Sequence, residues 1–327
     1  MKTNEKRAAF FHQTGMTMVE LMVSLAIGSF LMVGAVQVYN QSRQAFVINE
    51  SIARVQETAQ FAMDTVEADL RMASNWGQHS RGTSIEGRSL LGTANPLGLP
   101  APGGCGATWA LDLRRPVEGD NNGYTLPCAV VGGLQPNTDT VTTRRATVTA
   151  TPLAAGTLQV QTNRIEGQLM TDGNLPGAMT AADSETHNML INTYYVAASS
   201  TLIPGVPTLR RKSLVTAGGA PAIVDQEVAP GVENMQLQFG VDVNKDNTVD
   251  RYINPGDPIL NNADPAFIPG ARVMTARIWL VVRSVTQEIG LQDNVNYIAG
   301  DVNLGTYNDQ FRRMLVSKTI LLRNART

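Results

Sequence analysis

The feature that most constrains this chain is an apolar segment of 24 residues, 16–39, in which Glu20 is the single charged residue. As an α-helix rising about 1.5 Å per residue, the segment would cover roughly 36 Å, more than the roughly 30 Å of hydrocarbon in a bilayer. The preceding residues are polar and carry Lys2, Lys6 and Arg7 against Glu5. The positive-inside rule keeps such a segment cytoplasmic, so the chain after residue 39 is expected on the other side of the membrane.

Glu20 needs a partner if it lies within this span. A carboxylate in an apolar membrane helix costs on the order of 3 kcal/mol on insertion scales. The competing interpretations are a cleaved secretory signal and a plain signal anchor. A secretory signal ends in small residues after its apolar run, whereas residues 36–40 read VQVYN. Neither interpretation explains Gly15 or Glu20.

Residues 15–22, Gly-Met-Thr-Met-Val-Glu-Leu-Met, resemble the signal of type IV prepilins and type II secretion pseudopilins. In that family a basic leader ends in Gly, an apolar residue follows, and a Glu occupies the fifth mature position of an apolar helix. The resemblance implies that a prepilin peptidase cuts between Gly15 and Met16 and methylates the new amino group of Met16. Two departures are that Met16 replaces the common Phe and that Gln37 stands where many major pilins have a kinking Pro.

This cleavage would give Glu20 its partner. In a staggered array of helices, the carboxylate of one subunit could neutralise the terminal amine of its neighbour in a low-dielectric environment. Small residues along the segment would let neighbouring helices approach closely; they are Ser24, Gly28, Ser29 and Gly34. Assembly would thus remove a buried-charge penalty.

The helix is expected to continue to about residue 73, because there is no Pro before Pro96 and no Gly between Gly34 and Gly77. Apolar residues at steps of three or four form one stripe that needs a sheet to cover it: Ile48, Ile52, Val55, Ala59, Ala62, Val66 and Leu70.

The remainder predicts a sheet. Residues 75–137 are rich in Gly, Pro and Asn and are typical of a long loop region with short strands. Alternating or β-branched segments then predict strands at 138–150, 157–163, 189–197, 208–215, 232–243, 273–285 and 314–323. The fold class is therefore α+β and pilin-like, a long N-terminal helix packed on a mostly antiparallel sheet. The predicted division is a leader at 1–15, a pilin helix at 16–73 with its membrane span at 16–39, and a β-rich head at 74–327.

Cys105 and Cys128 form no CxxC pair and have no neighbouring His. In an exported protein a single disulfide is the simplest interpretation, and two buried free thiols are the alternative.

Residues 242–250 place side-chain oxygens with the spacing of a calcium loop: Asp242, Asn244, Asp246 and Asp250, with the carbonyl of Thr248 at the seventh position. Asn247 stands where an EF-hand has Gly, and Ile253 where it has its bidentate Glu. The loop therefore predicts either a Ca2+ clip or an Asx-rich turn between strands.

Residues 231–242, the acidic loop after them and the C-terminal segment 312–324 resemble PilW-type minor pilins. That resemblance implies a subunit that primes assembly of a type IV pilus at or near the filament tip. The implied partners are other minor pilins, a tip adhesin, the major pilin and the inner-membrane assembly platform, with membrane lipid around the helix before assembly. The implied location is the bacterial inner membrane, with a single span and a periplasmic head, and later the pilus on the cell surface.

Two further functions remain open: a type II secretion pseudopilin, and an adhesive or ligand-binding module at the tip. A membrane-tethered hydrolase is disfavoured because no HExxH, GxSxG or Walker pattern occurs, and His79 and His187 are expected in surface loops. The net charge of −2 gives no reason to expect nucleic acid, and the clusters of basic residues are expected at solvated strand ends: Arg114–Arg115, Arg144–Arg145, Arg210–Lys212 and Arg312–Arg313.

Overall fold

Helix α1 spans Met18–Met72 in the computed structural model, which describes residues 15–88, 97, 99, 104–106, 109–261 and 264–326. The predicted leader, apart from Gly15, lies outside the described residues. The chain divides into two compact units, Met1–Ser51 and Ile52–Thr327. The head discussed below is the second unit.

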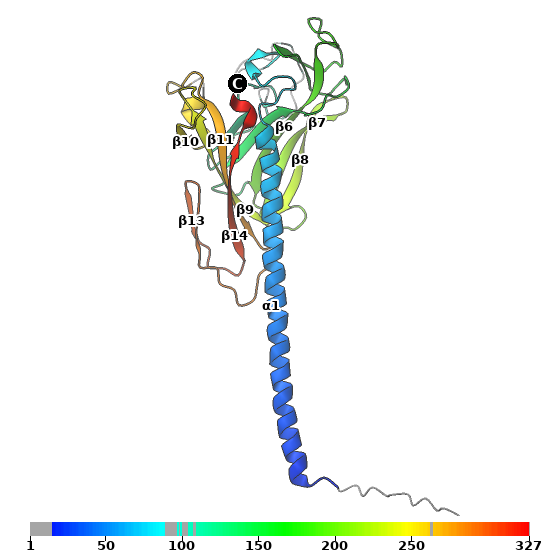
Figure 1. Cartoon of the computed structure of the whole chain (residues 1–327), viewed down its shortest axis with the longest axis vertical. Helices are drawn as coiled ribbons and strands as arrows, with labels where there is room; N and C mark the ends of the chain where they lie inside the picture. Colours follow the sequence, from blue (N-terminus) through cyan, green and yellow to red (C-terminus); the bar gives the residue numbers. More distant parts are fainter. Residues whose placement is uncertain are drawn as a thin grey trace, which may run out of the picture. The chain divides into compact units, whose positions relative to one another are not determined.

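The strands of the head follow the helix in chain order (Figure 1). They are β1 (Ile85–Glu86), β2 (Val117–Asp120), β3 (Thr140–Ala146), β4 (Gln159–Thr162), β5 (Gly167–Met170), β6 (Glu185–Ala197), β7 (Thr208–Ala217), β8 (Ala220–Pro230), β9 (Val232–Asp242), β10 (Arg251–Ile253), β11 (Arg272–Arg283), β12 (Asn296–Ala299), β13 (Val302–Thr306) and β14 (Arg313–Leu321). Short 3-10 helices are η1 (Gly82–Ser84), η2 (Pro258–Leu260) and η3 (Arg323–Arg326).

Three sheets result. The largest has the order β1-β5-β4-β6-β3-β2, with β7 and β8 added beside β6; the second has the order β10-β9-β11-β14; and β12 pairs with β13. Every pairing between these strands is antiparallel except that of β1 with β5. The expected α+β fold, a long apolar N-terminal helix and a mostly antiparallel sheet, is confirmed.

The last part of α1 packs against both large sheets (Figure 1). The predicted stripe is confirmed from Val55 onward, because Val55, Ala59, Ala62, Val66 and Leu70 are buried in one core with residues of β6, β9 and β11. Ile52 is only half-buried. Ile48 is exposed and belongs to the first unit, so the expectation that it needs the sheet is wrong.

A second core lies on the opposite face of β6, since side chains alternate along a strand. Tyr194 joins the helix-side core, whereas Met189 and Ile191 join a cluster with Trp76 and Trp109. The disulfide between Cys105 and Cys128, which is present as predicted, lies at the edge of this cluster. The described residues of this cluster from Trp76 to Cys128 therefore cover the second face of β6.

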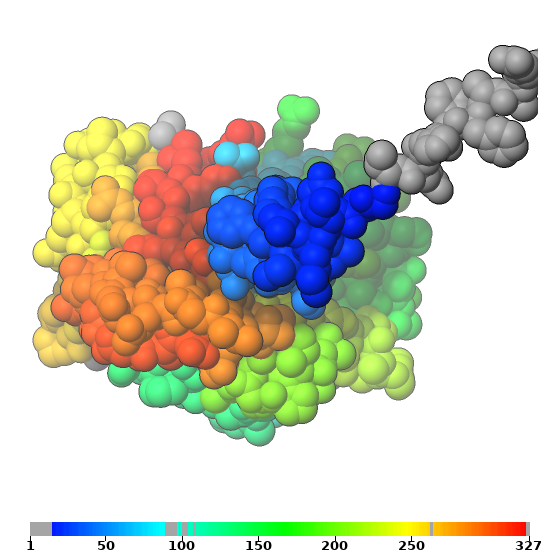
Figure 2. All heavy atoms as spheres, turned by 90° about the horizontal axis from the view of Figure 1, so that it is seen from below, coloured from blue at the N-terminus to red at the C-terminus, as the bar shows by residue number. Residues whose placement is uncertain are grey.

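Residues 284–312 leave β11 and return as β14, carrying the β12–β13 hairpin between them. Figure 2 shows this segment in orange beside the red C-terminal segment. Backbone bonds from Ser284 to Arg312 (2.8 Å) and from Glu288 to Gln310 (2.8 Å) connect its two arms.

Several basic residues expected at solvated strand ends are buried instead. Arg144 is 1% exposed and donates to Glu118 and to the carbonyl oxygen of Trp109 at 2.6 Å. Arg313 is held by Glu233 (2.6 Å), Asp293 (3.1 Å) and Asp309 (2.6 Å). Arg210 and Lys212, on β7, are also buried and reach carboxylates across the strand pair. The expectation is wrong at these positions because each cation has a carboxylate partner, which is the condition for burying a charge.

Candidate assembly site

The predicted cleavage site lies just before the first turn of α1. Gly15, Met16 and Thr17 have no regular secondary structure and are exposed, and the helix begins at Met18. A Cβ atom added at Gly15 would meet nothing within 4 Å. The described part of the chain therefore does not itself require glycine at this position.

Glu20 does have partners within its own chain. Its Oε2 accepts hydrogen bonds from the backbone N–H of Thr17 at 2.9 Å and from the Thr17 hydroxyl at 3.0 Å. The Glu20 N–H in turn donates to Thr17 Oγ1 at 3.3 Å. Thr17 is the N-cap residue and Glu20 the third helical residue, so the two form a capping box.

Thr17 was not predicted as a site residue from the sequence. Its signal was present, because the pattern Thr-x-x-Glu directly before an apolar run is the sequence signature of a capping box. The carboxylate also lies at the end of the helix where its dipole favours negative charge.

The apolar residues that follow have no packing within their own unit. All side chains from residue 15 to residue 50 are exposed, and Phe30, for example, is 81% exposed. Nothing lies within 4 Å of the Cβ positions of Gly28 and Gly34. By length and composition, α1 is the candidate membrane span among the described residues. An apolar surface of this kind requires lipid or neighbouring helices to cover it.

The predicted calcium loop, residues 242–250, is held by hydrogen bonds between its own residues. Asp242 is fully buried, accepts from the N–H groups of Lys245 (2.6 Å) and Asn247 (3.0 Å), and pairs with Arg272 at 3.0 Å. Asp246 accepts from the N–H and the hydroxyl of Thr248, at 2.8 and 2.6 Å.

The rest of the loop follows the same pattern. Asp250 accepts from the Val243 N–H at 2.7 Å and from the Asn244 side chain at 3.2 Å. Among the described residues, no three acidic, His or Cys side chains gather as a metal site would require. The arrangement is that of the Asx-rich turn, and calcium binding is not supported.

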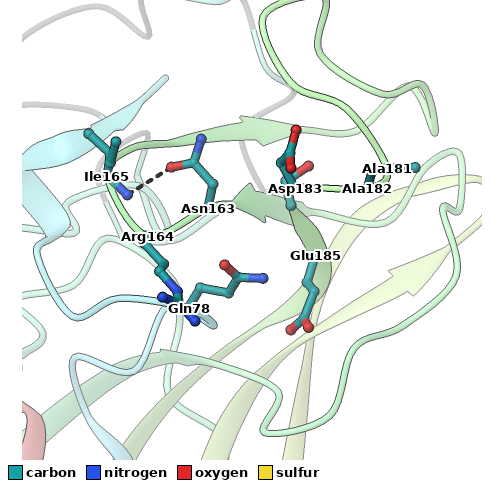
Figure 3. A pocket seen from close by; sticks show the side chains of 9 residues that line it. Gln78, Asn163, Arg164, Ile165, Ala181, Ala182, Asp183 and Glu185 are labelled. Atoms are coloured by element: carbon teal, nitrogen blue, oxygen red, sulfur yellow. Dashed lines mark hydrogen bonds between the residues drawn. The ribbon is translucent and has the colours of Figure 1, made fainter.

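A polar cleft of about 530 Å³ opens between the β4–β5 turn and residues 181–185 (Figure 3). Arg164 and Gln78 lie on one side of it, and Asp183 and Glu185 on the other. Ser184, also in the lining, donates to the Thr180 carbonyl at 2.6 Å and accepts from Gln161 at 2.7 Å. Among the residues that the structure describes, no base contacts its hydroxyl.

The expectation of surface-loop histidines is wrong for His187. It lies in β6, is 2% exposed, and its Nδ1 is 2.9 Å from the carbonyl oxygen of Thr147. Its Nε2 is 3.4 Å from Glu185 Oε2. His79 is half-buried, and its Nδ1 accepts from the Arg81 N–H at 3.2 Å.

Comparison with known protein families gave two matches. Residues 11–36 match the family described as the prokaryotic N-terminal methylation motif. Residues 193–324 match the family described as Type IV Pilus-assembly protein W. No curated protein and no solved structure matches the chain.

Proposed function

Since this chain is a type IV prepilin-like protein, a PilW-type minor pilin, we propose that it helps to initiate assembly of a type IV pilus from a position at or near the filament tip. The observation that carries the proposal is the arrangement of Gly15, Thr17 and Glu20 at the start of an exposed apolar helix. The assembly role is supported by the family match over residues 193–324, which includes β7 to β14.

The first step of the proposal is processing. A prepilin peptidase cuts between Gly15 and Met16 and methylates the Met16 amine. The exposed, non-helical backbone at residues 15–17 supports this, because a peptidase must hold its substrate in an extended form. The leader stays cytoplasmic, α1 anchors the chain in the inner membrane, and the head lies in the periplasm.

The second step is docking through Glu20. Both bonds from Thr17 go to Oε2, and Oε1 accepts none from the described residues. A carboxylate offers about four lone-pair sites, so Oε1 can take the terminal amine of a neighbouring subunit while the capping box stays intact. The capping box would hold the carboxylate in place, which lowers the entropy cost of the charge pair.

The partners in this proposal are other minor pilins, a tip adhesin, the major pilin and the assembly platform. At Gly28 and Gly34 no side chain projects from the helix and nothing lies within 4 Å of the position a Cβ would take, which supports close approach of neighbouring helices. The pilin family supports a structural, non-enzymatic role.

The test is Glu20→Gln, which keeps an amide oxygen for the capping box and removes the charge. We expect normal cleavage and methylation, but at least tenfold less of the variant in sheared pili and in complexes with other minor pilins. Thr17→Val is the comparison variant: it removes the hydroxyl of the capping box but keeps the Glu20 charge and the Thr17 N–H bond to it, so we expect it to lose less incorporation than Glu20→Gln. Wild-type incorporation of Glu20→Gln would rule out the charge-pair mechanism.

A type II secretion pseudopilin is the second candidate, because the N-terminal methylation motif fits it equally well. Deleting the gene separates the two. Loss of surface pili and twitching supports the pilus role, whereas blocked enzyme secretion with normal pili supports the pseudopilin role.

A further inference from the structure

Strand β14 has an open edge. It pairs with β11 over nine consecutive residue pairs without a bulge, and it is the last strand of its sheet. Apart from this ladder, no backbone hydrogen bond of residues 313–321 to another described residue is found. Within the described parts of the chain, the backbone groups on its second side therefore have no partner strand.

The residues that present these groups follow from the hydrogen bonds at the two ends of the ladder. The Leu322 N–H donates to the Met274 carbonyl at 2.9 Å, and the Ser284 N–H donates to the Arg312 carbonyl at 2.8 Å. Hydrogen-bonded and non-bonded pairs alternate along an antiparallel ladder. The even-numbered residues of β14 therefore bond to β11, and the odd-numbered ones direct their N–H and C=O groups outward.

Four of these outward-directed residues are exposed: Leu315, Ser317, Thr319 and Leu321. Their side chains share one face and carry no charge. Lys318, on the opposite face, pairs with Glu67 of α1. A strand added here would meet an uncharged face with leucines at 37% and 41% exposure towards its two ends.

The other outer strands of the two large sheets are short or blocked. β1, β2 and β10 have two, four and three residues. β8 has eleven residues but contains Pro221 and Pro230, together with Asp225 and Glu227. Proline and charge are the usual means by which natural sheets prevent edge pairing. β14 has nine residues and contains no proline. Its outward-directed positions from residue 315 to residue 321 also carry no charged side chain.

We propose that the β14 edge binds an extended segment of another pilus component, which adds a strand to the β10-β9-β11-β14 sheet. Main-chain bonds to Leu315, Ser317, Thr319 and Leu321 supply the affinity, and the uncharged face selects a segment with apolar or β-branched side chains. The choice of occupant rests on the proposed function, in which this subunit meets other pilus components.

The test compares Ser317→Pro with Ser317→Ala in the full-length chain, expressed in its own membrane. Both variants remove the hydroxyl, but only proline removes the outward N–H, and an edge strand tolerates proline at such a position. We expect the pilus components that co-purify with the chain to fall about tenfold or more for Ser317→Pro and to be unchanged for Ser317→Ala. Tryptophan fluorescence should give both variants a wild-type unfolding temperature. Wild-type recovery of partners by a folded Ser317→Pro variant would overturn the proposal.

A second measurement does not depend on proline being tolerated. A photo-crosslinking residue at Thr319 should give an adduct whose mass identifies another pilus component. An adduct with a second copy of this chain, or none, would contradict the proposed occupant. If Ser317→Pro restores pili and partners to a deletion strain, the edge proposal fails while the pilus role stands. If the deletion strain is normally piliated, the pilus role itself fails.

Discussion

Asp69 is the residue whose loss should most weaken the attachment of α1 to the head. It is 3% exposed. Its Oδ1 accepts from Arg145 Nε at 3.0 Å and Nη2 at 2.8 Å, and its Oδ2 accepts from the Asn192 amide and the Tyr194 hydroxyl, both at 2.6 Å. One carboxylate on the helix thus satisfies three side chains of β3 and β6. Burial, with the Asp69 charge beside the hydroxyl, raises the pKa of Tyr194 and keeps it a donor.

We expect Asp69→Ala to destabilise the head by about 4 kcal/mol, because removing one partner of a buried ion pair costs roughly 3–5 kcal/mol. For a unit of this size, that lowers the unfolding temperature by about 10 °C. The assay is tryptophan fluorescence of the full chain in detergent. All three tryptophans, Trp76, Trp109 and Trp279, lie in the head, so the signal reports this unit.

Asp64→Ala is the matched control on the same helix. The Asp64 side chain is 55% exposed and accepts a 2.8 Å hydrogen bond from Gln60. Its loss should cost about 1 kcal/mol or less, as is usual for exposed charges. The reasoning would be refuted if Asp69→Ala unfolded within 2 °C of the Asp64→Ala variant. A buried carboxylate with three side-chain partners and an exposed carboxylate would then contribute equally to the stability of the head.

Much of the fold could be predicted because local patterns and tertiary packing agree. The seven predicted strands correspond to β3, β4, β6, β7, β9, β11 and β14. β8 was missed because Pro221, Pro230 and its acidic residues are unfavourable in strands, and pairing with β7 overrides them. Short strands were expected within residues 75–137, where β1 and β2 lie, but without bounds; β5, β10, β12 and β13 were missed, because a few residues give no period to detect.

The buried ion pairs of the head could not be predicted from the sequence. Arg144 and Arg313 look like solvated residues until the carboxylates of Glu118 and Glu233, far away in the chain, are brought beside them. A one-dimensional pattern does not contain these partners. For the assembly site the opposite holds, because Thr17 and Glu20 interact locally and their spacing alone specifies the capping box.

Two further predictions follow from single residues. Gly15→Leu should leave a full-length, unmethylated precursor whose head unfolds at the wild-type temperature, since a Cβ at Gly15 meets nothing within 4 Å; a mature N-terminus at Met16, found by intact mass, would contradict the cleavage site. The second concerns pH. The hydrogen bond from Arg313 holds the pKa of Asp309 below its ordinary value of 3.8. Because the folded-state pKa is the lower one, the stability that Asp309 contributes is present above about pH 4 and is lost as the pH falls through the folded-state pKa. Asp309→Asn should therefore lower the unfolding temperature at pH 6 more than at pH 2, and an equal decrease at both pH values would show that the charge of Asp309 does not stabilise the fold.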